Sequence, residues 1–263
     1  MIQTRIITVL IVLPIIIILV FAGGLWFLAG VSLVALVAGW EFNQMMKTGG
    51  YTPNPFLILG LIVLLLLNSY RSDLDLAGII SLALLLSLVW QLFRTTVTPT
   101  ADWALSLAGG LYIGWSMAHL VALRQLADGL VWVWLALLAT WAADTAAYLV
   151  GRAWGRHKLW PRHSPKKTWE GFIVGIGGGL IGAAIVVFFS NLGWGVGLLA
   201  GAIVSIAGLF GDLSISMMKR HVGVKDSSNF LPGHGGFLDR IDSLLFVNVV
   251  VYYYAVWSGM FGF

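Results

Sequence analysis

The chain has 263 residues, of which 59% are hydrophobic and only 10% are charged, and its mean hydropathy is +0.93. Soluble domains carry roughly 25% charged residues, so this composition excludes an ordinary soluble protein and indicates an integral membrane protein. Cysteine is absent, which excludes disulfides and thiolate metal sites. The formal net charge is +4 and becomes informative only once the sidedness of the charges is considered.

Apolar segments long enough to cross a bilayer follow one another along the whole chain. A spanning helix needs about 20 mainly apolar residues. The segments predict an all-α, polytopic membrane helix bundle of about nine spans, at residues 6–21, 25–46, 55–70, 76–93, 103–123, 130–150, 168–189, 196–218 and 239–257. The first segment follows Arg5 and resembles a signal peptide, but further apolar segments follow at once, so we interpret it as an uncleaved span. Glu41, near the end of the second span, is interpreted as an interfacial carboxylate.

We expect one structural unit with two regions: residues 1–125 hold the first five spans, and residues 126–263 form a catalytic region. Cytoplasmic loops are expected at 151–167 and 219–238. With the N-terminus inside, only Arg71 and Arg124 among the 15 Lys and Arg lie outside. This bias predicts a cytoplasmic N-terminus and cytoplasmic polar loops.

The most polar run of the chain extends from Ser214 to Asp242. Lys219 and Arg220 end one predicted helix, and Asp239 and Asp242 share a face at the start of the next. Turn-forming segments lie between them, at residues 226–229 and 232–236. Paired carboxylates beside cationic side chains can hold a divalent cation against a phosphate, so this run is either a solvated loop or a reaction site at the membrane surface.

Two acids lie inside predicted spans, where an ionisable group is costly and usually functional. Asp212 shares a helix face with Ser216 and Lys219, and is interpreted as a metal ligand directed towards Asp239. The alternative is a structural ion pair with Lys219, Arg220 or Arg240. Asp144 is expected to face the same cavity, the alternative being a buried acid satisfied by neighbours such as Thr145.

The basic loop from Arg152 to Lys167 is explained in its simplest form as a positive-inside anchor that attracts anionic lipid headgroups. Its end, Ser164-Pro165-Lys166-Lys167-Thr168, precedes an apolar helix. Free N–H groups at a helix start together with lysines make an anion site, although Thr168 alone could be a simple N-cap.

His234 lies in a Pro-Gly-His-Gly-Gly segment whose glycines permit close backbone approach to a ligand. It is a candidate phosphate donor or acid/base, and a purely structural role is the alternative. His157, His163 and His221 are interpreted as interfacial. The run from Gly177 to Gly182 fits G-x-G-x-x-G, but it lies within a span, so we expect helix packing there and no dinucleotide site.

The polar run resembles, along its whole length, the signature of phosphatidate cytidylyltransferases (CDP-diacylglycerol synthases). The matching positions are Ser216, Lys219-Arg220, Lys225-Asp226, Pro232, His234-Gly235-Gly236, Asp239-Arg240 and Asp242. The segment around Asp144 and the Ser-Pro-Lys-Lys-Thr-x-Glu-Gly segment match the same family. The resemblance covers roughly Asp144 to Asp242, while the first half of the chain matches only in hydrophobic character.

The resemblance implies a Mg²⁺-dependent reaction in which phosphatidate attacks the α-phosphorus of CTP, giving CDP-diacylglycerol and diphosphate. On this reading Asp212, Asp239, Lys219, Arg220 and His234 are catalytic. Metal ligands would be Asp212, Asp239, Asp144 and Asp242. Substrate or phosphate contacts would come from Ser164, Lys166, Lys167, Thr168, Ser216, Lys225, Gly235, Gly236 and Arg240. The family also implies a second metal such as K⁺ and a homodimer; no nucleic-acid partner is expected.

Three other functions remain open from the residues alone. A CTP-dependent lipid kinase would transfer the γ-phosphoryl group to a lipid alcohol. A secondary transporter would explain buried acids without chemistry, but would be expected to show internal repeats. A membrane scaffold would not need acids inside its spans. Short loops and the lack of a targeting extension favour a bacterial plasma membrane, with the site facing the cytoplasm.

Overall fold

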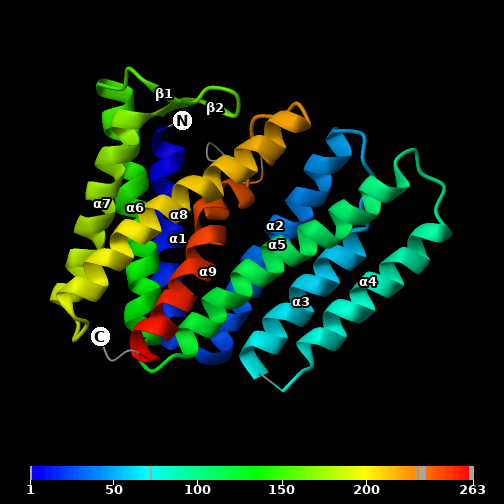
Figure 1. Ribbon diagram of the computed structural model, residues 1–263, viewed down its shortest axis with the longest axis horizontal. Helices are drawn as coiled ribbons and strands as arrows, with labels where there is room; N and C mark the ends of the chain where they lie inside the picture. Colours follow the sequence, from blue (N-terminus) through cyan, green and yellow to red (C-terminus); the bar gives the residue numbers. More distant parts are fainter. Residues whose placement is uncertain (1, 72, 229, 231–234, 261–263) are drawn as a thin grey trace. The chain divides into compact units, whose positions relative to one another are not determined.

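The computed structural model describes residues 2–71, 73–228, 230 and 235–260. The described residues form nine helices, as the apolar segments predict, and one two-stranded sheet (Figure 1). The helices are α1 (Ile2–Ala22), α2 (Gly24–Thr48), α3 (Pro55–Arg71), α4 (Leu76–Leu92), α5 (Pro99–Gln125), α6 (Gly129–Ala153), α7 (Trp169–Phe188), α8 (Trp194–His221) and α9 (Leu238–Met260).

Six of these helices, α2 and α5 to α9, are long and apolar enough to cross a membrane. The apolar stretch of α1 from Leu10 to Ala22 and the 17-residue helices α3 and α4 are shorter. A helix is the expected form for these sequences, because it pairs backbone groups within one segment where lipid offers no partners. The all-α polytopic architecture is confirmed.

The helix ends follow local sequence signals. Gly50, with φ of +87°, lies just after α2 in a conformation that favours glycine. The Asp75 carboxylate caps α4 by accepting from the Ala77 N–H at 3.0 Å. The Thr168 hydroxyl caps α7 by accepting from the Gly171 N–H at 3.2 Å, which is the N-cap role left open from the sequence.

The basic loop contains a small sheet that the all-α prediction did not include. Strand β1 (Lys158–Trp160) pairs antiparallel with β2 (Ser164–Thr168), with Lys158 opposite Thr168 and Trp160 opposite Ser164. Each strand is only a few residues long and mostly exposed. Such short strands carry too little alternation of apolar and polar residues to be recognised from sequence.

The chain divides into two compact units. The N-terminal unit comprises Met1–Gln125 together with Lys219–Ile241, and the C-terminal unit comprises Leu126–Met218 together with Asp242–Phe263. In the N-terminal unit α3 packs on α5, and α2 contacts both of them. Its core includes the fully buried side chains of Phe42, Ile58, Leu65 and Ile113.

In the C-terminal unit α6 and α7 run side by side (Figure 1). Glycines of α7 allow the close approach, because a Cβ at Gly178 would lie 2.6 Å from the Ala142 carbonyl oxygen, and one at Gly182 would lie 2.6 Å from that of Leu138. The glycine run that fits G-x-G-x-x-G is therefore a helix-packing surface, as predicted.

Candidate active site

A buried ion pair joins the two ends of the polar run. Lys219, in the last turn of α8, places Nζ 2.6 Å from Oδ1 of Asp239, in the first turn of α9. Only 11% of the Lys219 side chain and 5% of the Asp239 side chain are exposed. Burying one of these charges without the other would be costly, so the pair fixes the two helix ends together within the N-terminal unit.

The second oxygen of Asp239 accepts three further hydrogen bonds. Oδ2 accepts from the Ser227 N–H at 2.8 Å, the Ser227 hydroxyl at 2.9 Å and the Gly236 N–H at 3.0 Å. An ionised carboxylate is a pure acceptor, and donors on both oxygens favour that form and hold its orientation. The Asp239 carboxylate therefore holds Ser227 and Gly236 close to the start of α9.

The two glycines before α9 are needed for this geometry. Gly235 has φ of +80°, a conformation that other residues rarely adopt. A Cβ on Gly236 would collide with the side chains of Ser227 and Glu41. Any side chain at Gly236 would therefore displace the amide that donates to Asp239.

Glu41 has contacts that the sequence interpretation did not foresee. The residue is only 3% exposed, and its carboxylate contacts the polar run. Oε1 accepts from the Ser228 hydroxyl at 2.6 Å and the Phe237 N–H at 3.0 Å, while Oε2 accepts from the Ser227 hydroxyl at 3.2 Å and the Leu238 N–H at 2.8 Å. The available signal was an acid near the end of an apolar span.

A second lysine–carboxylate pair lies in the C-terminal unit. Lys167 Nζ is 2.6 Å from Asp212 Oδ2, and the Ser216 hydroxyl donates to Asp212 Oδ1 at 3.1 Å. The shared face of Asp212 and Ser216 is confirmed. Asp212 does form an ion pair, but its partner is Lys167 and not Lys219, Arg220 or Arg240, the partners considered from the sequence.

Asp144 and Asp242 both accept hydrogen bonds from Ser243. The Ser243 hydroxyl donates to Asp144 Oδ2 at 3.3 Å, and the Ser243 N–H donates to Asp242 Oδ1 at 2.8 Å. Asp144 lies on α6 and both other residues lie on α9. The C-terminal unit therefore places an acid from the sixth span beside the last acid of the polar run.

The histidines interpreted as interfacial have specific contacts. His157 Nδ1 lies 2.6 Å from Glu170 Oε1, which connects the loop before β1 to the first turn of α7. His221 Nε2 lies 2.9 Å from the Tyr51 hydroxyl, and the two rings are stacked. His163 stacks on Trp160. His234 lies outside the described residues.

The other predicted phosphate ligands differ in exposure. Ser164 lies within β2, and Thr168 is buried at the start of α7. Arg220 donates to the Val224 carbonyl oxygen at 3.3 Å. Four of the predicted cations have exposed side chains: Lys166, Arg220, Lys225 and Arg240.

The predicted metal ligands are divided between the units, with Asp239 in one and Asp144, Asp212 and Asp242 in the other. In the described part of either unit, no three acidic or histidine side chains gather into a ligand set. Their carboxylate oxygens are nevertheless the donor type that Mg²⁺ requires. Asp212 and Asp239 each have a lysine beside them, so each fits a site that holds a cation and phosphate oxygens together.

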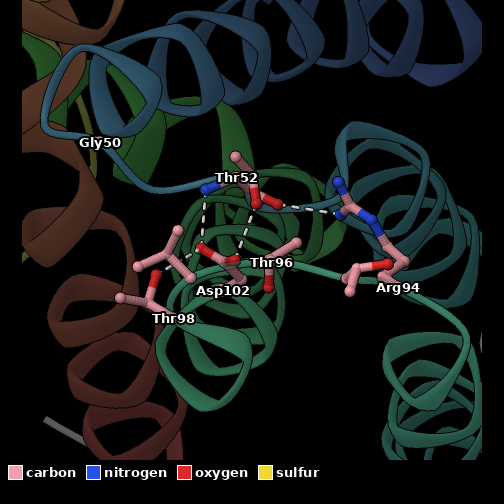
Figure 2. A pocket seen from close by; sticks show the side chains of 8 residues that line it. Gly50, Thr52, Arg94, Thr96, Thr98 and Asp102 are labelled. Carbon is pink, nitrogen blue, oxygen red and sulfur yellow. Dashed lines mark hydrogen bonds between the residues drawn. The ribbon is translucent and has the colours of Figure 1, made fainter.

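A hollow of about 510 Å³ lies elsewhere in the N-terminal unit, at the segments that follow α2 and precede α5. Figure 2 shows the Asp102 carboxylate between Thr52 and Thr98, with Arg94 directed at the Thr52 carbonyl oxygen. Asp102 is 1% exposed and accepts from the Thr52 N–H at 2.6 Å and the Thr52 hydroxyl at 2.7 Å. These bonds account for a structural role of Asp102 in joining two loops.

The fold and these side chains define a polytopic all-α membrane protein with two lysine-paired carboxylates, Asp212 within α8 and Asp239 in the first turn of α9. Comparison with known proteins identifies the class further: the sequence profile of the Cytidylyltransferase family matches residues 3–257. The chain is 40% identical to a phosphatidate cytidylyltransferase of Staphylococcus haemolyticus over 250 residues, which cover 93% of this chain and 94% of that protein. The enzymes of the same name from Staphylococcus saprophyticus and Staphylococcus aureus are each 36% identical, with the same coverage. The chain belongs to the cytidylyltransferase family.

The different burial of the two ion pairs gives a stability prediction. Lys219→Ala leaves the buried Asp239 charge without its cation and should lower the free energy of unfolding by about 3–5 kcal/mol. Lys167→Ala is the matched control, because 23% of the Lys167 side chain and 29% of the Asp212 side chain are exposed. It should lower the free energy of unfolding by no more than about 1 kcal/mol. Denaturant unfolding in detergent measures both, and equal losses would contradict the assignment.

Proposed function

We propose that this protein is a phosphatidate cytidylyltransferase, an enzyme that forms CDP-diacylglycerol and diphosphate from CTP and phosphatidate. The observation that carries the proposal is the buried Lys219–Asp239 pair, because it places a cation and an ionised acid together inside the motif shared with that family. Family membership over nearly the whole chain supports the same activity.

In the proposed step, a phosphate oxygen of phosphatidate attacks the α-phosphorus of CTP. A new P–O bond joins the two phosphates while the bond from the α-phosphorus to the oxygen bridging to the β-phosphorus breaks. Diphosphate leaves with the electron pair of that bond. A phosphate monoester is largely dianionic at neutral pH, so the nucleophile needs little help from a general base.

Mg²⁺ is proposed as the cofactor. Asp212 and Asp239 would hold it, with Asp144 and Asp242 extending the ligand set, because carboxylate oxygens suit this ion. When bound, the ion neutralises charge on the phosphates as diphosphate leaves. A second metal such as K⁺ rests on the family resemblance alone.

The lysines and arginines are proposed to bind the phosphates of both substrates. Lys219 and Lys167 each neutralise one acid already, so each would bridge a carboxylate and a phosphate oxygen. The exposed cations are suited to the phosphates of a soluble nucleotide: Lys166, Arg220, Lys225 and Arg240. Supporting contacts are assigned to Ser164, Thr168, Ser216, Gly235 and Gly236, and His234 keeps its predicted role as donor or acid/base.

Transfer of isotope from CTP identifies the reaction. We expect purified protein in detergent, given phosphatidate and Mg²⁺, to move a label on the cytidine into the lipid extract while diphosphate is released. Asp239→Asn, which weakens the pair with Lys219, should reduce this rate by about 100-fold or more.

The other outcomes separate the alternatives. A γ-phosphate label that enters lipid, without the cytidine label, would identify a lipid kinase. Failure of both labels to enter lipid would overturn the enzyme assignment and favour transport. Full activity of Asp239→Asn would leave the enzyme but overturn the site.

We also propose that the site faces the cytoplasm of a bacterial plasma membrane, on the distribution of Lys and Arg between the predicted loops. The natural absence of cysteine makes this testable with single cysteines. Lys158→Cys, in β1, should react with a membrane-impermeant maleimide only after cells are permeabilised. Ala127→Cys, between α5 and α6, should react in intact cells, and the reverse pattern would contradict the orientation.

A homodimer is proposed on the family resemblance alone. The mass of the protein in detergent, measured by light scattering, decides between dimer and monomer.

A further inference from the structure

The Glu41 carboxylate lies in the first half of the chain, yet every donor that it receives comes from the polar run more than 180 positions later. The hollow of about 490 Å³ beside it is lined mostly by apolar side chains, among them Val37 and Trp40. In such surroundings a buried carboxylate needs its full set of partners. Glu41 has two donors on each oxygen.

Two of these donors are backbone amides at the start of α9. Phe237 N–H and Leu238 N–H belong to the first turn, where helix N–H groups have no partner within the helix. A carboxylate at this end is also favoured by the helix dipole. Glu41 therefore fixes where α9 begins, and Asp239 is the next residue along.

Ser227 connects Glu41 to Asp239 directly. Its hydroxyl oxygen lies 3.2 Å from Glu41 Oε2 and 2.9 Å from Asp239 Oδ2. A hydroxyl carries a single proton, so it can donate fully to only one of these two carboxylates. The Ser227 N–H donates to Asp239 in either case, and the serine is thereby held between the two acids.

We propose that Glu41 is a positioning residue for the transfer reaction: it anchors Ser227, Ser228 and the start of α9 to α2, so that Asp239 keeps its place against Lys219. The proposal rests on the proposed function. Glu41 contacts neither phosphate nor metal in this account, and its effect passes through Ser227 and the start of α9.

The test compares kcat and KM, both calculated per folded molecule, for two isosteric variants, Glu41→Gln and Asp102→Asn. In Glu41→Gln, either orientation of the amide places an NH₂ group against a backbone N–H donor, so bonds to the segment are lost. We expect kcat to fall by about 100-fold, the cost typical of a small misplacement of reacting groups, while the KM for CTP changes less than about threefold.

Asp102→Asn is the matched control, because Asp102 is a similarly buried acid of the same unit whose hydrogen bonds go to Thr52 and Thr98 and, within the part of the polar run that the structure describes, to no residue. It should lower stability yet leave kcat within about twofold of the original protein. A Glu41→Gln enzyme with unchanged kcat, or with an effect confined to KM, would overturn the proposal, as would an equal loss of kcat in Asp102→Asn.

Ser228→Ala keeps the proposal testable if Glu41→Gln fails to fold. It removes one hydroxyl that donates to Glu41 at 2.6 Å and that, among the residues the structure describes, bonds neither Asp239 nor Lys219. We expect kcat to fall by about tenfold, and an unchanged kcat would overturn the proposal. Lack of cytidine transfer by the unaltered protein would instead refute the proposed function, so the two failures are distinguishable.

Discussion

The ionised Asp239 carboxylate is the constraint on which the N-terminal unit depends. A buried charge is tolerated only when it is paired and hydrogen-bonded. Lys219 supplies the opposite charge, and the loop supplies three further donors. Because two of those donors are backbone amides, the positions of Ser227 and Gly236 and the conformation of Gly235 follow from the needs of one side chain.

The same constraint explains why a distant acid belongs to the site. The backbone N–H groups of Phe237 and Leu238, at the start of α9, have no partner within the helix and need an acceptor of their own. Glu41 is that acceptor, so α2 becomes part of the support of the catalytic segment. The residues proposed to carry the chemistry come from the second half of the chain, but Glu41, in the first half, contacts two neighbours of one of them, Asp239, namely Ser227 and Leu238.

Much of the fold could be predicted from the sequence, for physical reasons that differ between its elements. The spans are long apolar runs, and the GxGxxG run was correctly assigned to helix packing because its context was a span. The Thr168 cap follows from its position before an apolar helix. Glu41 and Lys167 were different, because their partners lie far along the chain and no local pattern encodes such contacts. The β1–β2 hairpin was missed because its strands are too short to show a period.

Binding of Mn²⁺ in place of Mg²⁺ tests, without relying on turnover, the proposal that Asp239 holds a divalent cation beside the substrate phosphates. Electron paramagnetic resonance of the protein with CTP would report the bound ion. The account predicts that Asp239→Asn weakens Mn²⁺ binding by about tenfold or more, whereas Asp102→Asn leaves it unchanged. Equal Mn²⁺ affinity in the original protein and in Asp239→Asn would contradict the account.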